Sequence, residues 1–439
     1  MRRLAVVLLL LLAPLSARAL EIERVVSPGG IEAWLVEEHS NPILALSFSF
    51  RGGSALDPVG KEGRARMATA LLDEGAGDLD SQAFQSELER LSIELSFAVT
   101  DDELTGSLVT LTETRARAAE LLSLALHAPR FDQEPVERVR AQLAVRVAQR
   151  ANDPQSLAYE KLQQQLFAEH PYGRSSEGTI ASLEALTVED LEAYVGQRLA
   201  LDTLKIGVVG DITPEELGPL LDRIFGGLAT ESPPIDLTEA ALQSQGQLTV
   251  IDVPVPQSVV YMAQTGPKRA DPDYYAAAVL NQILGGGTFS SRLYEEVRES
   301  RGLAYSVWSD LVDRDRAGFW MAGAATQNAR VADTLAIMRE VWAKLAAEGP
   351  TEEEVKNAIT YLTGSFALRL ASSENIARIL VSVQRDDLGI DYLDRRSSLF
   401  EAVSVEDVQR VAQQWLHPEQ LVVVVAGQPE GLESSAPVE

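Results

Sequence analysis

The chain carries one unit twice, and this repeat constrains the fold more than any other feature. The segment "NPILALSFSFRGGSALDP" begins at Asn41, and "VPQSVVYMAQTGPKRADP" begins at Val255; three of their residues recur 214 positions apart. Further on, "TVEDLEAYVGQRLALDTLKIGVVGD" matches "SVEDVQRVAQQWLHPEQLVVVVAGQ", with residues 217 apart. A spacing that drifts by only three residues across a unit indicates an old duplication with one small insertion.

Both units have the same order of predicted elements. Apolar side chains alternate at Leu44, Leu46, Phe48 and Phe50, which is typical of a strand with one buried face. Further strands are expected within 91–113 and 303–325, long amphipathic helices at 134–151 and 351–370, and a final apolar strand in each unit. Strands and helices that come in blocks predict an α+β fold with helices packed on a largely antiparallel sheet.

The N-terminus has the pattern of a secretory signal. Arg2 and Arg3 precede an apolar run from Leu4 to Leu12, and Ala17-Arg18-Ala19 forms a cleavage site. We therefore expect a signal peptide at 1–19 and a periplasmic or secreted protein. No later stretch is apolar enough to span a membrane. The repeat then predicts two similar domains, at 20–230 and 248–432, joined by a polar, proline-containing linker at 231–247.

Net charge and cysteine content exclude several kinds of function. The chain has 38 basic and 65 acidic residues, and loss of the three arginines of the signal leaves a balance of −30. Such a surface repels nucleic acid, so no nucleic-acid partner is expected, and it mildly favours basic peptides. With no cysteine, neither a disulfide framework nor a thiolate metal site is available.

One stretch of the second unit, "LGGGTFSSRLYEEVRESRGLAYSVWS", is a candidate for binding chemistry. Gly285, Gly286 and Gly287 end a helix and permit backbone conformations that other residues resist. A second helix then begins at a serine cap. Taken by residue type alone, Arg298 is an exposed helix residue paired with a glutamate, and Tyr305 belongs to a half-buried strand.

This stretch is similar to the second-domain signature of the insulinase/pitrilysin family of zinc metallopeptidases, which includes the mitochondrial processing peptidase. The first-domain segments "RGGSALDPVGKEGRARMATALLDEGA" and "DPQSLAYEKLQQQLFAEHPYGRSSEGT" resemble the family in the same order. The resemblance covers residues 24–430 and implies a clamshell of two homologous α+β domains, often dimerised with another such chain.

Active members of the family carry H-x-x-E-H on the first helix of the first domain, where two histidines bind Zn²⁺ and the glutamate activates water. Here Arg66 stands at the first histidine, Thr69 at the glutamate and Ala70 at the second histidine. The downstream metal ligand of the family falls at Arg146. A guanidinium stays protonated and cannot ligate zinc, so these degenerate positions predict a chain without a metal site.

No other residues offer a replacement for the metal site. The four histidines, His39, His127, His170 and His417, lack the spacing of helical ligands, and the sequence contains no G-x-S-x-G nucleophile motif. A zinc site built on carboxylates alone is disfavoured by the ligand preferences of that metal.

The resemblance also implies a role for the second domain. In catalytic members an arginine and a tyrosine seven residues apart reach toward the substrate, and the matching pair here is Arg298 and Tyr305. Short bacterial members often divide the work between a subunit with H-x-x-E-H and a partner with the Arg/Tyr pair.

These observations lead to the hypothesis of a non-catalytic, substrate-binding subunit of a heterodimeric periplasmic zinc peptidase. Arg298 and Tyr305 would complete the site of a homologous, zinc-bearing H-x-x-E-H partner, and Gly285–Gly287 would receive peptide. The alternative is a pseudo-enzyme that acts as a scaffold or peptide-binding protein. A lone active peptidase ranks last, because it requires zinc in this chain.

Overall fold

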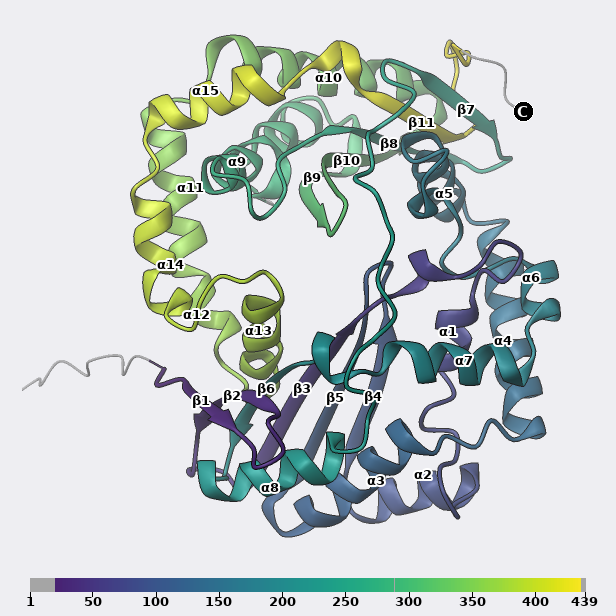
Figure 1. Cartoon of the computed structure of the whole chain (residues 1–439). Helices are drawn as coiled ribbons and strands as arrows, with labels where there is room; N and C mark the ends of the chain where they lie inside the picture. The colour runs from purple at the N-terminus through teal and green to yellow at the C-terminus, as the bar shows by residue number, and fades with distance from the viewer. Residues whose placement is uncertain (1–19, 288, 436–439) are drawn as a thin grey trace, which may run out of the picture.

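The computed structural model describes residues 20–287 and 289–435, and the predicted signal peptide at 1–19 lies outside this range. Two mixed but mostly antiparallel sheets form the framework, one in each half of the chain, with helices packed around them (Figure 1). This arrangement confirms the predicted α+β fold with two similar halves.

The first sheet has six strands in the order β1-β2-β6-β3-β5-β4, with β2 and β6 parallel and the other pairs antiparallel. Their bounds are β1 Glu23–Val26, β2 Glu32–Glu37, β3 Ile43–Arg51, β4 Glu94–Val99, β5 Glu103–Leu111 and β6 Lys205–Gly210. The final apolar strand of the first unit, β6, lies in the interior of the sheet, which explains why it is apolar after Lys205.

The second sheet repeats this plan with five strands in the order β7-β11-β8-β10-β9. Their bounds are β7 Leu248–Asp252, β8 Gln257–Thr265, β9 Ala304–Arg314, β10 Ala317–Gln327 and β11 Val422–Gly427. Again only one pair, β7 with β11, is parallel. β4 and β9 each form one edge of their sheet and pair with a single neighbour, and β1 and β7 form the opposite edges.

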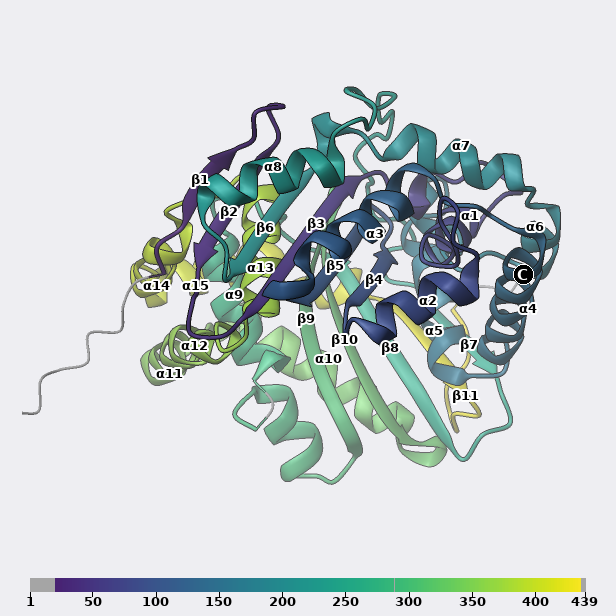
Figure 2. The ribbon, with the colours of Figure 1, turned by 90° about the horizontal axis from the view of Figure 1, so that it is seen from below.

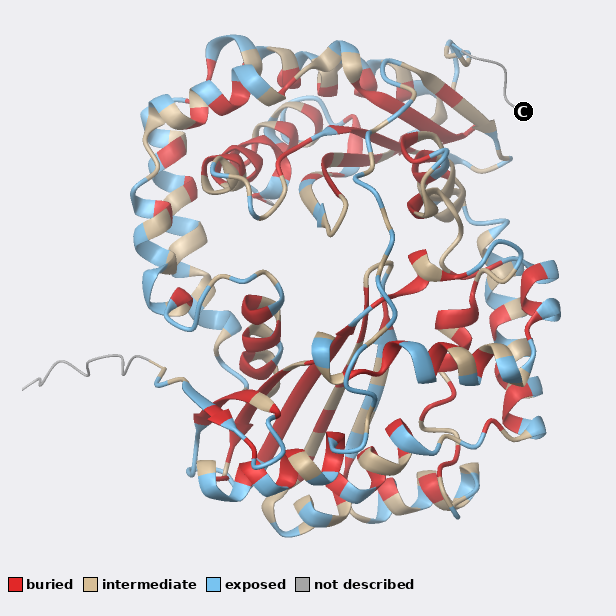
Figure 3. Ribbon diagram, in the orientation of Figure 1, coloured by how far each residue is buried: buried red, intermediate tan, exposed pale blue. Residues whose placement is uncertain are grey.

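The core of the first half lies on one face of its sheet. Leu44, Leu46, Phe48 and Phe50 are all at most 1% exposed and belong to one apolar cluster, which confirms the predicted alternation on β3. Figure 3 shows the buried strands beneath helices whose outer faces are exposed. The helices of this half are α1 Arg64–Thr69, α2 Ser81–Arg90, α3 Arg115–His127, α4 Gln133–Arg150, α5 Pro154–Leu166, α6 Ile180–Ala185, α7 Val188–Arg198 and α8 Pro214–Phe225.

The second half has a corresponding set of helices. They are α9 Tyr274–Asn281, α10 Val331–Glu348, α11 Glu352–Gly364, α12 Phe366–Arg369, α13 Ser373–Arg385, α14 Tyr392–Glu401 and α15 Val405–Trp415, with two π-helical segments, η5 Gln282–Gly286 and η6 Tyr294–Glu299. The single helix predicted at 351–370 is instead two, because the chain breaks after Gly364, a residue that weakens a helix interior.

The two halves exchange one helix each. Helix α5 of the first half packs on β8 and β11 of the second sheet, where Ala158, Leu162 and Leu166 join a buried cluster with Val424. Helix α13 of the second half packs on β3 and β6 of the first sheet (Figures 1 and 2). The packing units therefore do not follow the chain halves, and each sheet is covered in part by the other half.

The segment 231–247 between α8 and β7 contains no helix or strand. It crosses from one half to the other and is anchored on the way: Ala240 N–H donates to the carbonyl of Arg316, and Gln243 N–H donates to the carbonyl of Leu166. Across residues 20–287 and 289–435, no helix combines the length and the apolar character that crossing a membrane requires.

Candidate functional site

The helix with the degenerate metal positions, α1, is fixed at its start by a carboxylate. Gly63 precedes it in the left-handed region at φ +89°, where glycine is favoured. The backbone N–H groups of Gly63 and Ala65 each donate to Asp57 at 3.0 Å, and the buried Arg64 side chain lies beside the same carboxylate. The scaffold of α1 is thus intact, so its chemistry depends only on which side chains it carries.

In place of metal ligands, the site holds a cluster of two arginines around one carboxylate. Arg66 Nη2 donates to Glu177 Oε1 at 2.9 Å, and Arg146 Nη1 lies 3.8 Å from Glu177 Oε2. Glu177 is largely buried, with 12% of its side chain exposed. Thr69 is buried, and Ala70 packs against the core. The fold brings Arg66 and Arg146 together on Glu177, and this donor set does not fit zinc.

The histidines do not supply a metal site either. His39 contacts Glu37 and Asp211, and the hydrogen bond to Asp211 is the main cause that raises its pKa. His127 and His417 contact backbone carbonyls, and His170 packs against Tyr172. Within the part of the chain that the structure describes, no three His, Cys, Asp or Glu side chains gather in a way that would hold a metal ion.

Arg298 and Tyr305 do come together. The Arg298 guanidinium lies 5.2 Å from the Tyr305 ring centre and 5.0 Å from that of Tyr294, so it is stacked between two aromatic rings. Tyr305 is 78% exposed, which overturns the half-buried strand position that its residue type alone indicates. No ion pair of Arg298 with a glutamate occurs among the described residues; the neighbouring Arg301 makes one, to Glu296.

Gly285, Gly286 and Gly287 precede this pair in sequence, and the structure does not use them for backbone conformations that only glycine adopts readily. None of Gly285, Gly286 and Gly287 is in the left-handed region. A Cβ on Gly285 would lie 2.5 Å from the backbone nitrogen of Ser309 on β9. This glycine therefore allows η5 to approach the edge strand closely, and the binding role predicted for Gly285–Gly287 remains a prediction.

Arg298 and Tyr305 lie at the end of β9 opposite to its junction with the first half. At that junction, Arg314 Nη1 is 3.2 Å from Asp101 Oδ2, and Asp315 N–H donates to Asp102 at 3.1 Å. At about 3.4 Å per residue, the stretch from Tyr305 to Arg314 spans roughly 30 Å. Among the described residues, no hydrogen bond, ion pair or ring contact joins Arg298 or Tyr305 to Arg66, Arg146 or Glu177.

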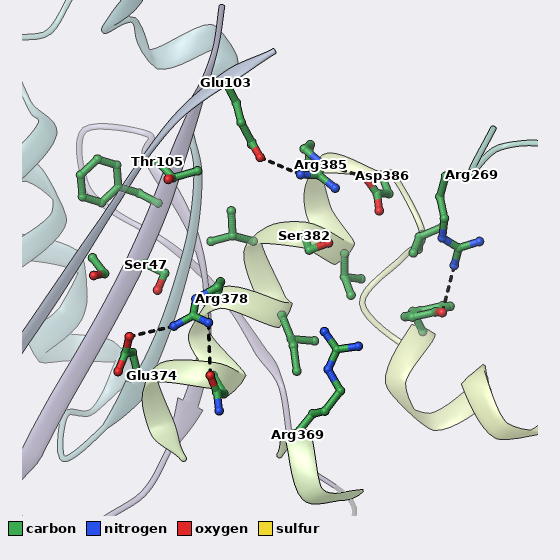
Figure 4. Close-up of a pocket in the computed structure, with 18 of the residues that line it drawn as sticks. Ser47, Glu103, Thr105, Arg269, Arg369, Glu374, Arg378, Ser382, Arg385 and Asp386 are labelled. Atoms are coloured by element: carbon green, nitrogen blue, oxygen red, sulfur yellow. Dashed lines mark hydrogen bonds and ion pairs between the residues drawn. The ribbon is translucent and has the colours of Figure 1, made fainter. Parts of the chain in front are cut away.

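A cavity of about 910 Å³ lies between the two halves. One wall is the face of β3, β4 and β5 opposite the core, with small side chains such as Ser47, Ser96 and Thr105. The other wall is formed by α12, α13 and α14 together with Arg269 and Tyr274 (Figure 4). The wall formed by the strands follows from the alternation of side chains along each strand, because apolar residues face the core and small polar residues face the cavity.

Comparison with known proteins agrees with this architecture. Residues 185–362 match the family model described as "Peptidase M16 inactive domain". The structure superposes on the peptidase M16 inactive domain from Pseudomonas fluorescens with a TM-score of 0.87 and 27% identity, covering 96% of this chain and 100% of that one. The non-peptidase homolog YmxG of Helicobacter pylori is 28% identical over 76% of this chain and 77% of its own length. The chain belongs to the insulinase-like (M16) family.

Within the M16 family, the chain is a non-catalytic, peptidase-like protein. It is also 25% identical to the probable mitochondrial-processing peptidase subunit beta of Schizosaccharomyces pombe, over 87% of this chain and 85% of the relative. The sequence contains no H-x-x-E-H motif.

Two features of the site were missed from the sequence. Glu177 follows Ser176 in a loop far from α1 in sequence, and no spacing connects it with Arg66. The arginines of the cavity come from residues 269 to 396, on elements that only the tertiary fold places together. The sequence offers no local signal for them, because the segment 366–396 contains five arginines and five acidic residues.

Proposed function

We propose that this chain is the non-catalytic, substrate-binding subunit of a heterodimeric zinc metallopeptidase of the periplasm. A homologous partner with H-x-x-E-H would hold the zinc ion and carry out peptide hydrolysis. This chain would contribute Arg298 and Tyr305 to the partner's active site.

The proposal rests on the position and exposure of the Arg/Tyr pair. Tyr305 is 78% exposed at the end of an edge strand, and the Arg298 guanidinium lies 5.2 Å from the centre of its ring. A tyrosyl hydroxyl and a guanidinium donate hydrogen bonds to a carbonyl oxygen that gains negative charge. Because the contacts among the described residues do not join this pair to Arg66, Arg146 or Glu177 of its own chain, a substrate held by a second subunit is the fitting target.

Peptidase activity of reconstituted mixtures tests the proposal. Quenched peptides of differing charge are incubated with the mature chain, with an H-x-x-E-H partner encoded beside it, and with both. We expect hydrolysis that is strong only in the mixture. Equal activity of the partner alone and of the mixture would contradict the proposal and support the scaffold or peptide-binding alternative, as would the absence of any such partner.

Tyr305→Phe tests the assigned residue. The change removes one hydroxyl donor, so turnover by the mixture should fall on the order of a hundredfold, while the two subunits still assemble. Tyr361→Phe, at another exposed tyrosine on α11, is the matched control and should leave turnover unchanged. Unchanged turnover of the Tyr305 variant, with assembly verified by gel filtration, would count against the role.

A further inference from the structure

The charge inside the cavity between the halves runs against that of the whole chain. Among the described residues, five arginines, four carboxylates and no lysine line it, although the whole chain has a formal charge of −27. Charges that face a confined, low-dielectric space act on a ligand more strongly than those spread over an open surface. The chemistry of this cavity therefore depends on which of its charges are already paired.

The carboxylates of the cavity are largely committed to partners. Arg385 contacts both Glu103, at 2.7 Å, and Asp386, at 2.9 Å, and Arg378 contacts Glu374 at 2.8 Å (Figure 4). The fourth, Asp313, accepts a hydrogen bond from the backbone N–H of Arg269, and burial raises its pKa. Two arginines thus account for three of the four acids.

The other three arginines, Arg269, Arg369 and Arg396, have no carboxylate partner in the part of the chain that the structure describes. Among the described residues, the Arg269 side chain donates only to the hydroxyls of Tyr275 and Tyr392, and the Arg396 side chain donates to the carbonyl of Leu362. Burial is the main cause that lowers the pKa of Arg396, and the charge of Arg369 adds to it. Like charges are thus held near one another without an anion between them.

Aromatic rings hold two of these guanidiniums in place. Arg269 lies 4.1 Å from the ring centre of Tyr274, and Arg396 lies 4.0 Å from that of Phe366 and 4.7 Å from that of Phe400. Stacking fixes the plane of a guanidinium and leaves its N–H edges free to bind a carboxylate with two hydrogen bonds. The side chains are therefore arranged before any ligand arrives, which lowers the entropy cost of binding.

We propose that this cavity binds the carboxylates of an acidic peptide segment through Arg269, Arg369 and Arg396. A peptide is the fitting occupant, because the opposite wall ends at the edge strand β4, whose unpaired backbone groups accept an extended chain. The small side chains of Ser96 and Thr105 leave room above the strand. The inference deepens the proposed function and rests on it, because the bound peptide is a substrate only if this chain is a subunit of a peptidase.

Binding to the mature chain alone tests the inference. Fluorescently labelled hexaglutamate, hexalysine and a neutral Gly/Ser peptide are compared by anisotropy. Hexaglutamate should bind at least about tenfold more tightly than the other two, and its affinity should weaken as salt rises from about 50 to about 200 mM. Equal or tighter binding of hexalysine, or the absence of hexaglutamate binding, would overturn the proposal.

Single variants locate the binding. Arg369→Gln and Arg396→Gln should each weaken hexaglutamate binding by about tenfold, the effect of one charge-assisted hydrogen bond. Arg369 is exposed on the short α12, so its replacement leaves the fold intact, and Arg223→Gln on the outer face of α8 is the matched control. Unchanged affinity in the Arg369 variant would refute the assignment.

The two proposals fail separately. Arg298 does not line the cavity, so Arg298→Gln should lower turnover by the mixture and leave hexaglutamate binding unchanged. Hexaglutamate binding without any gain of activity on mixing would retain the cavity assignment and reject the role as a subunit of a peptidase. Activity in the mixture without hexaglutamate binding would reject the cavity assignment alone.

Discussion

Arg66 and Arg146 bring positive charge into a partly buried region, and Glu177 is the carboxylate that both contact. In a metallopeptidase of this family the same positions would surround a cation that is held by neutral and negative ligands. Here the cations belong to the protein, and one carboxylate compensates them. The charges of this region are thus compensated within the chain by an ion-pair cluster.

Removal of the central carboxylate of this cluster should destabilise the protein. Glu177→Gln leaves the guanidinium of Arg66, whose side chain is 26% exposed, without its counter-charge, and should lower the free energy of unfolding by about 1–3 kcal/mol. Chemical denaturation measures the change. The double variant Arg66→Met/Glu177→Met should lose less stability than the sum of the losses in Arg66→Met and Glu177→Met. Strict additivity of these losses would show that the pair is not coupled.

At the scale of elements, the exchanged helices make the fold depend on small residues. A Cβ on Gly207 of β6 would lie 2.3 Å from the carbonyl oxygen of Ala377 and 2.8 Å from Leu380 Cβ, both on α13. The helix therefore lies directly on the strand at this glycine, and close packing of backbone on backbone joins the second half to the first sheet.

Gly207→Ala tests this contact. Because the clash is with backbone, which cannot move aside as a side chain can, the free energy of unfolding should fall by at least about 2 kcal/mol. The control is Gly196→Ala within α7, where a Cβ meets nothing within 4 Å; it should stabilise the protein by roughly 0.5–1 kcal/mol. Thermal or denaturant unfolding of both variants decides the matter, and similar effects of the two changes would contradict the packing argument.

At the scale of the whole molecule, the two halves are interlocked rather than merely linked. Helix α5 contributes to a cluster of the second half, α13 packs on the first sheet, and Arg314 and Arg385 make ion pairs across the junction. The segment 231–247 is therefore not needed to hold the halves together once they have folded.

Cleavage of this segment provides the test. A specific protease site inserted after the exposed Glu231, when cut, should give two fragments that elute together at the volume of the intact protein. They should separate only in denaturant, because separation would expose the apolar faces of α5 and α13. Gel filtration of the cut protein measures this, and elution of two separate fragments in buffer would refute the interlocked arrangement.

The sequence by itself determined the features that depend on local periodicity and on the order of motifs. The duplication and the alternation of Leu44 to Phe50 can be read without a structure, because residue type and spacing alone decide them. The assignment of Arg66, Thr69 and Ala70 to degenerate metal positions comes instead from the resemblance to the insulinase/pitrilysin family. The pairing of Arg298 with Tyr305 is also expected from the second-domain motif of the family, whereas the high exposure of Tyr305 is not.

Only the tertiary structure decided which distant residues meet. The contact of Glu177 with two arginines, the exchange of α5 and α13, and the cavity lined by Arg269, Arg369 and Arg396 join residues separated by tens to hundreds of positions. Such contacts follow from the packing of complete sheets and helices, and no local period records them. The same reason explains why the net charge did not predict the charge of the interior. The whole chain has a formal charge of −27, whereas its cavity holds three arginines without a carboxylate partner among the described residues.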